Sequence, residues 1–384
     1  MTTTPSVRPD PVLPDFDGPC LVNLVPALVA QLQPSPGPAP AWLPAALAGA
    51  RAVVLLLLDG LGAEQLAGRP HLAPTIAAAS GPPLTSVAPS TTATALTSLS
   101  TGLPPAVHGV VGYRVAVDGQ ILNVLHWRLD GADARQRLRP ATFQPYPAFP
   151  GAPVADGAGV PVVTRAEYAT TGFTVAHLGG TVLRGWHTAS GVALGVREAL
   201  GSGARFVYAY YDGVDRVAHA KGLGEHYDAE LRAVDRLVDD VLAVLPAGTA
   251  LVVTADHGQV DVGPAVEVVP PEVMASVVLV SGEGRFRWLH ARPGAADDVA
   301  AAAEAVFGHL AWVLTVEEMI DRGWLGGEPV PAVRDRLGDV ALVPFEPTAF
   351  LDPADTGELR LVARHGSLTP AEMLVPLAAW APAD

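Results

Sequence analysis

Cysteine is almost absent from this chain, and so are the features that direct a protein into a membrane. The 384 residues include one cysteine, Cys20, which excludes an internal disulfide and any metal site built from several thiolates. The N-terminus lacks the basic start and apolar stretch of a signal peptide. The longest purely aliphatic run, 53–58, is far shorter than the roughly 20 residues that span a bilayer. We therefore expect a cytoplasmic protein without a membrane partner.

Positive charge is also scarce. The chain has 24 Lys and Arg against 39 Asp and Glu, a formal net charge of −15. Binding to a nucleic-acid polymer requires clustered Lys and Arg that contact its phosphates, and no such cluster occurs. An acidic protein usually attracts an anionic substrate locally, through bound cations. The composition therefore argues against a nucleic-acid polymer and leaves a small anionic ligand at a metal site as the natural partner.

Three apolar runs, AVVLLLLDGLG, FVYAYYDGVD and ALVVTADHG, have the composition of strands buried on both faces of a parallel sheet. Each run closes on an aspartate. The carboxyl ends of parallel strands line the ligand crevice of an open α/β sheet, so we expect these carboxylates to converge there. Helical patterns at 91–101, 189–200 and 226–244 supply the crossover connections.

The remaining segments set the predicted domain boundaries. We expect an N-terminal extension, 1–50, packed on an α/β core that comprises 51–261 and 346–384. Between the two parts of the core, 262–345 reads as a small α+β insert and a candidate lid, with a strand pair around Gly282 to Gly284 and an Ala-rich helix. The Pro- and Gly-rich stretch 128–163 predicts a long excursion over the surface.

Two segments near the first apolar run carry polar residues with both a structural and a chemical interpretation. Asp59, before Gly60, is either a turn that ends a strand or a metal ligand. In the run PSTTATALTSLSTG, a hydroxyl residue caps the helix. A helix N-terminus also offers free N–H groups to a phosphoryl group beside a hydroxyl nucleophile. The two interpretations of the hydroxyl run are compatible.

Three further places carry acidic and imidazole groups. Asp215 and His219 are four residues apart and share one face of a helical turn, either as a surface pair or as metal ligands. Asp256 and His257 stand at a strand end, where a bend turns both toward one crevice. His365 lies late in the chain, in RHGS, and is an ordinary loop histidine when considered alone.

Taken together, the set of ligands is more informative than its members. Three carboxylates and three imidazoles near strand ends are the oxygen and nitrogen donors that zinc or manganese prefers. Three Asp contribute −3 and two divalent ions +4, which leaves a net positive centre that holds a phosphate and favours an ionised hydroxyl. The sequence therefore predicts two divalent metal ions, most simply zinc, with manganese as the alternative.

The pieces LLLLDG, PSTTATALTSLSTGLPPAVHG, YYDGVDRVAHAKG, TADHG and RHGS, in that order, resemble the alkaline phosphatase superfamily, and within it the nucleotide pyrophosphatase/phosphodiesterase group. The resemblance extends from residue 51 to the closing EMLVPLAAW, although no motif covers the insert. It implies an alkaline-phosphatase-like α/β fold, a three-layer sandwich around a mainly parallel sheet. It also implies a hydrolase of phosphodiesters or nucleotide pyrophosphates.

The resemblance assigns roles to individual residues. One metal would be held by Asp215, His219 and His365, and the second by Asp59, Asp256 and His257. Thr92 would be the nucleophile, facing the second metal and forming a phosphothreonine intermediate; its spacing to the Thr101-Gly102 pair favours it over Thr91. His108 fits the family pattern as a residue that fixes a loop.

The resemblance is weakest at the substrate contacts. Tyr113 occupies the place where phosphodiesterases of this family usually have an asparagine that holds a phosphoryl oxygen, and Asn123 is a candidate substitute. An arginine clamp would favour monoesters, and Arg114 and Arg128 are the available donors. A phosphomonoesterase or phosphonate hydrolase on the same metals is therefore the alternative function, and a non-catalytic phosphate or metal binder is a third. The substrate would be a small phosphate ester such as a nucleotide; the oligomeric state is open.

Overall fold

The structure, a computed structural model, describes residues 8–154, 159–355, 357 and 360–381. Residues 1–7 of the expected N-terminal extension and 382–384 of the expected core lie outside the described residues, as do 155–158, 356 and 358–359. Among the helices described, none is sufficiently long and apolar to cross a membrane.

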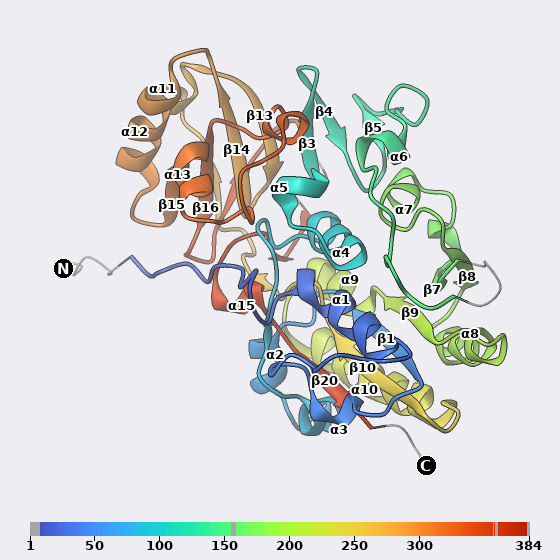
Figure 1. Ribbon diagram of the computed structural model, residues 1–384. Coiled ribbons are helices and arrows are strands. Elements are labelled where there is room, and N and C mark those ends of the chain that lie inside the picture. Colours follow the sequence, from blue (N-terminus) through green and yellow to red (C-terminus); the bar gives the residue numbers. More distant parts are fainter. Residues whose placement is uncertain (1–7, 155–158, 356, 358–359, 382–384) are drawn as a thin grey trace.

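Six strands form the central sheet (Figure 1), in the order β20-β10-β1-β9-β7-β8. All neighbours are parallel except β20, which runs antiparallel to β10. The mainly parallel central sheet expected from the apolar runs is confirmed. The strands are β1 (Ala52–Leu58), β7 (Pro161–Arg165), β8 (Val182–Trp186), β9 (Phe206–Tyr211), β10 (Thr249–Thr254) and β20 (Ala378–Trp380).

Helices cover both faces of this sheet because its central strands are apolar throughout. Every residue of β1 and β10 is buried, as expected for strands packed on two sides. One group of helices comprises α8 and α10 with α3, and α1 packs with α4. The helices expected at 91–101, 189–200 and 226–244 are α4 (Thr92–Thr101), α8 (Ser190–Gly201) and α10 (Glu225–Ala243).

Shorter elements complete this part of the chain. The helices are α1 (Leu21–Gln31), α2 (Ala63–Ala67), α3 (Pro74–Ala79), α5 (Pro105–His108), α7 (Gly172–His177), α9 (Gly213–Lys221) and α15 (Pro370–Met373), with 3-10 turns at Ala45–Leu47 and Ala166–Tyr168. Two small antiparallel pairs join β2 (Leu84–Thr85) to β19 (Leu374–Val375) and β11 (Val260–Asp261) to β18 (Ala363–Arg364). The second pair brings the segment of His365 beside the end of β10.

Residues 262–345 contain a separate antiparallel sheet, in the order β13-β14-β16-β15, drawn in orange in Figure 1. It has its own hydrophobic cluster, which includes Leu289, Phe307 and Leu342. The elements are β12 (Val266–Val268), α11 (Pro271–Met274), β13 (Val277–Glu283), β14 (Phe286–Ala291), α12 (Ala296–Phe307), β15 (Ala311–Thr315), α13 (Val316–Asp321), α14 (Pro331–Arg334) and β16 (Val340–Pro344); β12 pairs with β17 (Ala349–Leu351).

A buried ion pair ties this second sheet to the rest of the protein. Arg285, in the turn between β13 and β14, lies 2.7 Å from the Glu372 carboxylate, and both side chains are completely buried. The remaining guanidinium N–H groups of Arg285 donate to backbone carbonyls at Pro344, Glu346 and Thr348. Such a fully bonded pair is costly to break, because either partner left alone would be a buried, uncompensated charge.

The stretch 128–163 differs from the surface excursion that we predicted. Part of it belongs to a four-stranded antiparallel sheet of β3 (Arg114–Val117), β4 (Gln120–Asn123), β5 (Arg128–Leu129) and β6 (Ala132–Asp133), followed by α6 (Pro140–Phe143). Phe143 and Phe149 are buried, and the Phe143 ring packs edge-on against Trp127. The Pro and Gly content concealed these scattered aromatic anchors, because they follow no regular period.

Candidate metal centre and active site

The predicted ligands lie where three neighbouring strands of the central sheet end. Asp59 directly follows β1, and Asp256 and His257 follow β10, its neighbour on one side. Asp215 and His219 lie on α9, which begins after β9, the neighbour on the other side. Parallel strands end at one edge, so the strand order gathers these groups.

One group of potential metal ligands comprises Asp59, Asp256 and His257, all buried, with donor atoms within 4.8 Å of one another. His257 Nε2 lies 3.6 Å from Asp59 Oδ1 and 3.4 Å from Asp256 Oδ2. Backbone N–H groups of Gly60 and His257 donate to the other Asp256 oxygen, each at 3.1 Å. These two bonds fix the carboxylate and leave Oδ2 directed at the imidazole.

The second group comprises Asp215, His257 and His365. His365 Nε2 lies 3.8 Å from Asp215 Oδ1, and His219 Nε2 lies 3.2 Å from the same oxygen. The His257 and His365 rings stack with their centroids 3.6 Å apart. Thus the structure brings all six predicted ligands together, and His257 stands between the two groups rather than in one of them.

The three imidazoles share one hydrogen-bonding arrangement. Nδ1 lies 2.8 Å from the Ala363 carbonyl in His219, 3.1 Å from the Gly258 carbonyl in His257 and 3.1 Å from the Ser90 carbonyl in His365. A carbonyl only accepts, so each Nδ1 carries the proton and each Nε2 is the unprotonated nitrogen. Burial lowers the pKa of His257, and the pKa of His365 falls well below its usual value. Neutral imidazoles of this tautomer are metal ligands.

The carboxylates fit a cation for a complementary reason. Burial raises the pKa of Asp59 well above its usual range, and the charges of Asp256 and Asp215 raise it further. Asp59 Oδ1 and Asp256 Oδ2 are buried and have no hydrogen-bond partner among the residues described. Buried charge without a partner is unfavourable, and a divalent ion would neutralise it. The residues present therefore fit a metal ion.

Thr92 is the first residue of α4, and its hydroxyl faces this cluster. Thr92 Oγ1 lies 3.0 Å from His257 Nε2. The neighbouring Thr91 hydroxyl instead donates to Glu283, the last residue of β13, at 2.9 Å. This hydroxyl is therefore already hydrogen-bonded. Of the two threonines, Thr92 has its hydroxyl within hydrogen-bonding distance of a predicted metal ligand, and Thr91 has its hydroxyl on Glu283.

Two other predicted residues have roles away from the ligands. Asp212, the aspartate that directly follows β9, belongs to neither group of potential ligands, and Arg165 and the Tyr168 hydroxyl hold its carboxylate, each at 2.7 Å. The prediction that the aspartates at all three strand ends converge was therefore wrong for Asp212. His108 is buried between the Ser98 hydroxyl, 2.8 Å away, and the Val110 N–H. It fixes a loop, as expected.

The residues predicted to contact the substrate differ in their position relative to the site. Tyr113 lines a cavity of about 290 Å³ together with Thr92, His219 and His365. Asn123 is not among the residues that line it; its amide donates to the Tyr113 hydroxyl at 2.7 Å. Arg114 is buried and forms ion pairs with Asp352 and Asp355, so its charge is already used.

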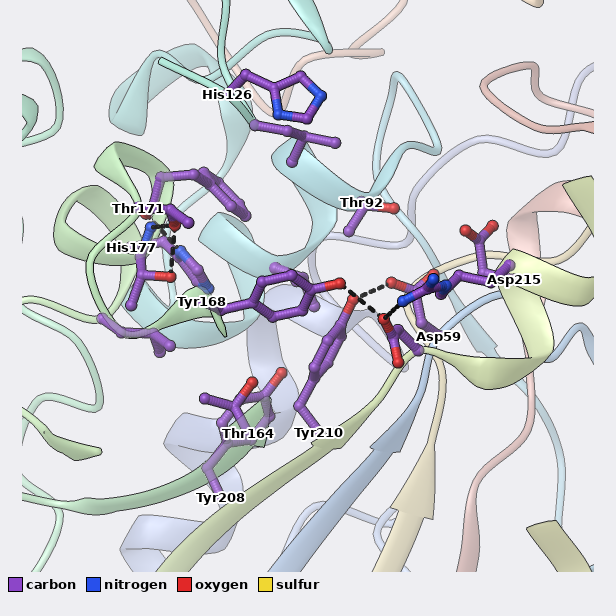
Figure 2. A pocket seen from close by; sticks show the side chains of 17 residues that line it. Asp59, Thr92, His126, Thr164, Tyr168, Thr171, His177, Tyr208, Tyr210 and Asp215 are labelled. Atoms are coloured by element: carbon purple, nitrogen blue, oxygen red, sulfur yellow. Dashed lines mark hydrogen bonds and ion pairs between the residues drawn. The ribbon is translucent and has the colours of Figure 1, made fainter. Parts of the chain in front are cut away.

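A second cavity, of about 230 Å³, is also lined by Thr92 and was not anticipated from the sequence. Figure 2 shows Tyr168, Tyr208 and Tyr210 along its wall, with the Tyr210 hydroxyl bonded to Asp59. Tyr208 and Tyr210 alternate along β9, so the period of two places both on one face. That alternation could have indicated the cavity from the sequence. Phe173 and His177, which line the cavity from α7, show no comparable sequence pattern.

Gln259 was also missed, and it holds the carboxylate of a predicted ligand. Its side chain is buried, and Nε2 donates to Asp215 Oδ1 at 2.6 Å. We expect Gln259→Leu to weaken metal binding by about 10- to 100-fold, because outer hydrogen bonds orient metal ligands. Competition titration with a zinc chelator measures the change.

Gln65 provides the matched control. It is buried beside Gln259 but donates only to the backbone carbonyls of Gln259 and Ala371. Gln65→Leu should lower stability by about 1–3 kcal/mol and leave metal affinity within a few-fold of wild type. Equal losses of affinity in the two variants would contradict the positioning role of Gln259.

Comparison with known proteins agrees with this geometry. The family model of type I phosphodiesterase/nucleotide pyrophosphatase matches residues 53–368. Murine ectonucleotide pyrophosphatase/phosphodiesterase 5 has a similar structure, with a TM-score of 0.63, 17% identity, and 86% of this chain and 88% of that chain covered. An inactive variant of that protein in complex with AMP has a TM-score of 0.61 at the same identity and coverage. No curated protein matches the sequence.

The two comparisons establish different things. At 17% identity the structural similarity shows the fold alone, a mixed α/β architecture around a mainly parallel central sheet. The family match covers most of the chain, from β1 to the residues just after His365, and confirms the resemblance drawn from the motifs. The chain belongs to the type I phosphodiesterase/nucleotide pyrophosphatase family and is a phosphoric ester hydrolase.

Proposed function

We propose that this protein hydrolyses small phosphodiesters or nucleotide pyrophosphates, with Thr92 as nucleophile and a phosphothreonine intermediate. One observation carries the proposal: Thr92 Oγ1 lies 3.0 Å from His257 Nε2, at the point where the two groups of ligands meet. A hydroxyl in this position is beside a residue that belongs to both groups of potential metal ligands, where bound ions would activate it. It also stands at the N-terminus of α4, a ten-residue helix whose free N–H groups favour a bound phosphoryl group.

Two divalent ions, zinc or manganese, would bind to this set of residues. Asp59, Asp256 and His257 would hold one ion, and Asp215, His219 and His365 the other. When bound, the ions would supply Lewis-acid stabilisation of the charge that develops on the attacking, phosphoryl and leaving oxygens.

The reaction would then proceed through two successive displacements at phosphorus. In the first, the Thr92 oxygen attacks phosphorus and the leaving alcohol departs, which yields phosphothreonine. In the second, water attacks the same phosphorus from the vacated side and releases Thr92. The three Nδ1 bonds hold each imidazole in place throughout, so little reorganisation is needed as charge moves, and such preorganisation supplies most of the acceleration.

A small nucleotide is the substrate class that the cavities favour. The 230 Å³ cavity beside Thr92 is walled by Tyr168, Tyr208 and Phe173, which suit an uncharged ring. One solved structure of the murine relative is that of an inactive variant in complex with AMP. The net charge of −15 favours small esters over a nucleic-acid polymer.

The ion pairs of Arg114 favour diesters over monoesters as substrates. A dianionic monoester calls for an arginine clamp on its extra charge. The Arg114 guanidinium is buried in ion pairs with Asp352 and Asp355 and so offers no such clamp. The phosphomonoesterase alternative therefore loses one of its two candidate donors.

Substrate comparison tests the proposal. Zinc- or manganese-loaded protein should hydrolyse bis-p-nitrophenyl phosphate and the p-nitrophenyl ester of thymidine 5′-monophosphate with kcat/KM at least about tenfold above that for p-nitrophenyl phosphate, a difference of about 1.4 kcal/mol. Preference for the monoester would move the assignment to a phosphatase. Inactivity toward all three, with both metals bound, would favour a binding protein.

A further inference from the structure

His126 stands where the cavities of the site meet. Its side chain, with that of Leu125, lines the cavity beside Tyr208 and Tyr210, the cavity of His219 and His365, and an outer groove. Thr92 lines the first two of these cavities as well. Figure 2 shows the imidazole on the side of the cavity away from Asp59 and Tyr210. An ester bound at Thr92 would thus have His126 on its outer side.

The backbone around His126 is held firmly. Its N–H donates to Asn123 Oδ1 at 3.0 Å, and the same amide group donates to the Tyr113 hydroxyl. The next residue, Trp127, is completely buried, has a φ of 53° and donates from its indole to the Leu138 carbonyl at 2.7 Å. A non-glycine residue in this left-handed conformation persists only where its surroundings dictate it. His126 is therefore presented by a rigid turn.

Several of the other proton carriers that line these cavities are already engaged. The Tyr210 and Tyr168 hydroxyls donate to Asp59 and Asp212. His177 Nδ1 donates to the Phe173 carbonyl at 2.7 Å, and burial lowers the pKa of His177 to about 4, so that imidazole stays neutral. The imidazoles of His219 and His365 belong to the predicted metal ligands. By contrast, no described residue forms a hydrogen bond or ion pair with the His126 imidazole.

We propose that His126 is a catalytic residue that protonates the leaving group, an inference that rests on the proposed function. In the first step the ionised Thr92 oxygen forms a bond to phosphorus, the phosphorus–oxygen bond to the leaving group breaks, and the imidazolium gives its proton to the departing oxygen. In the second step water attacks phosphorus and gives a proton to the neutral imidazole, while the Thr92–phosphorus bond breaks and Thr92 leaves as its ionised oxygen. Overall, diester and water give a phosphomonoester and an alcohol, and His126 is regenerated.

The role predicts a dependence on the leaving group. p-Nitrophenolate is a stable anion and departs without a proton, whereas an alkoxide needs one as the bond breaks. Loss of a general acid should therefore slow hydrolysis of an alkyl ester far more than hydrolysis of a nitrophenyl ester. A residue that only positions the substrate would affect the two esters equally.

The test compares the ethyl and p-nitrophenyl esters of thymidine 5′-monophosphate, with release of the monophosphate followed by chromatography. In His126→Ala, kcat/KM for the ethyl ester should fall by about 10²- to 10⁴-fold, and that for the nitrophenyl ester by less than about tenfold. His309→Ala, which removes an exposed imidazole of the second sheet's domain, is the matched control and should change neither value. Zinc content and Tm are measured for every variant.

Two results would overturn this role. An equal loss on both esters would make His126 a positioning residue, and restoration of the ethyl ester rate by His126→Gln would reduce it to a hydrogen-bond donor, because glutamine cannot transfer a proton in this way. Failure of wild type on both esters would overturn the proposed function itself, and so is distinguishable from failure of the inference.

Discussion

Thr92→Ala should lower kcat/KM for a diester by about 10⁴- to 10⁶-fold, the loss typical of removing a catalytic nucleophile. The physical reason is that no other described hydroxyl has the position of Thr92 Oγ1, 3.0 Å from His257 Nε2. Steady-state kinetics with the p-nitrophenyl ester of thymidine 5′-monophosphate measures the loss. Acid quenching during turnover should trap phosphothreonine on the peptide that contains Thr92 in wild type, and none in the variant.

Thr91→Ala is the control for this experiment. The Thr91 side chain has the same chemistry and is adjacent in sequence, but its hydroxyl donates to Glu283. We expect this variant to stay within about tenfold of wild type, since it loses one hydrogen bond to a carboxylate, which contributes roughly 1.5–3 kcal/mol to stability, and keeps the Thr92 hydroxyl. If Thr92→Ala kept more than a few per cent of wild-type activity, or if Thr91→Ala were the inactive variant, the assignment of the nucleophile would be wrong.

Removal of the metal ions should have the next largest effect. Chelation is expected to lower activity by about 10³-fold or more, because Lewis-acid stabilisation contributes several kcal/mol to the barrier. Zinc or manganese should restore it. Binding should also stabilise the fold, by about 2.7 kcal/mol when free metal is a hundredfold above its Kd, and a rise in Tm measures this independently of activity.

Asp256→Asn tests whether that stabilisation arises at the predicted site. Asp256 Oδ2 is buried without a partner among the described residues, and burial raises the pKa of this carboxyl. The variant should lose most of the metal-dependent rise in Tm, yet without metal it should be at least as stable as wild type, since a buried charge has been removed. Asp240→Asn, on the exposed side of α10, should behave like wild type. An unchanged response to metal in Asp256→Asn would place the ions elsewhere.

Much of the fold could be predicted because its signals are local. The β1 and β10 runs are continuous in Val and Leu, and α10 has its apolar residues on one face. The pattern within each element therefore predicts which of its residues are buried. The stretch 128–163 could not be predicted in the same way. Phe143 and Phe149 are buried by contacts with residues far away in the sequence, such as Phe206, and no periodicity announces such contacts.

The candidate site shows the same division. Asp59 and Asp256 could be predicted as neighbours, because parallel strands end at one edge whatever their order in the chain. Asp212 has an equally suggestive place in the sequence, but Arg165 at the end of β7 holds its carboxylate. Nothing within FVYAYYDGVD indicates that competition, since it depends on which strand lies next to β9.

The sequence by itself determined the ligand chemistry, the strand ends that carry it and the family, because motifs hold these in a few adjacent residues. Only the tertiary structure decided that His257 stands between two groups of predicted ligands, that Gln259 holds Asp215 and that His126 lines the same cavities as Thr92. Each of these depends on the direction of a side chain relative to a distant segment. Long-range packing sets such directions, and one strand or turn does not encode them.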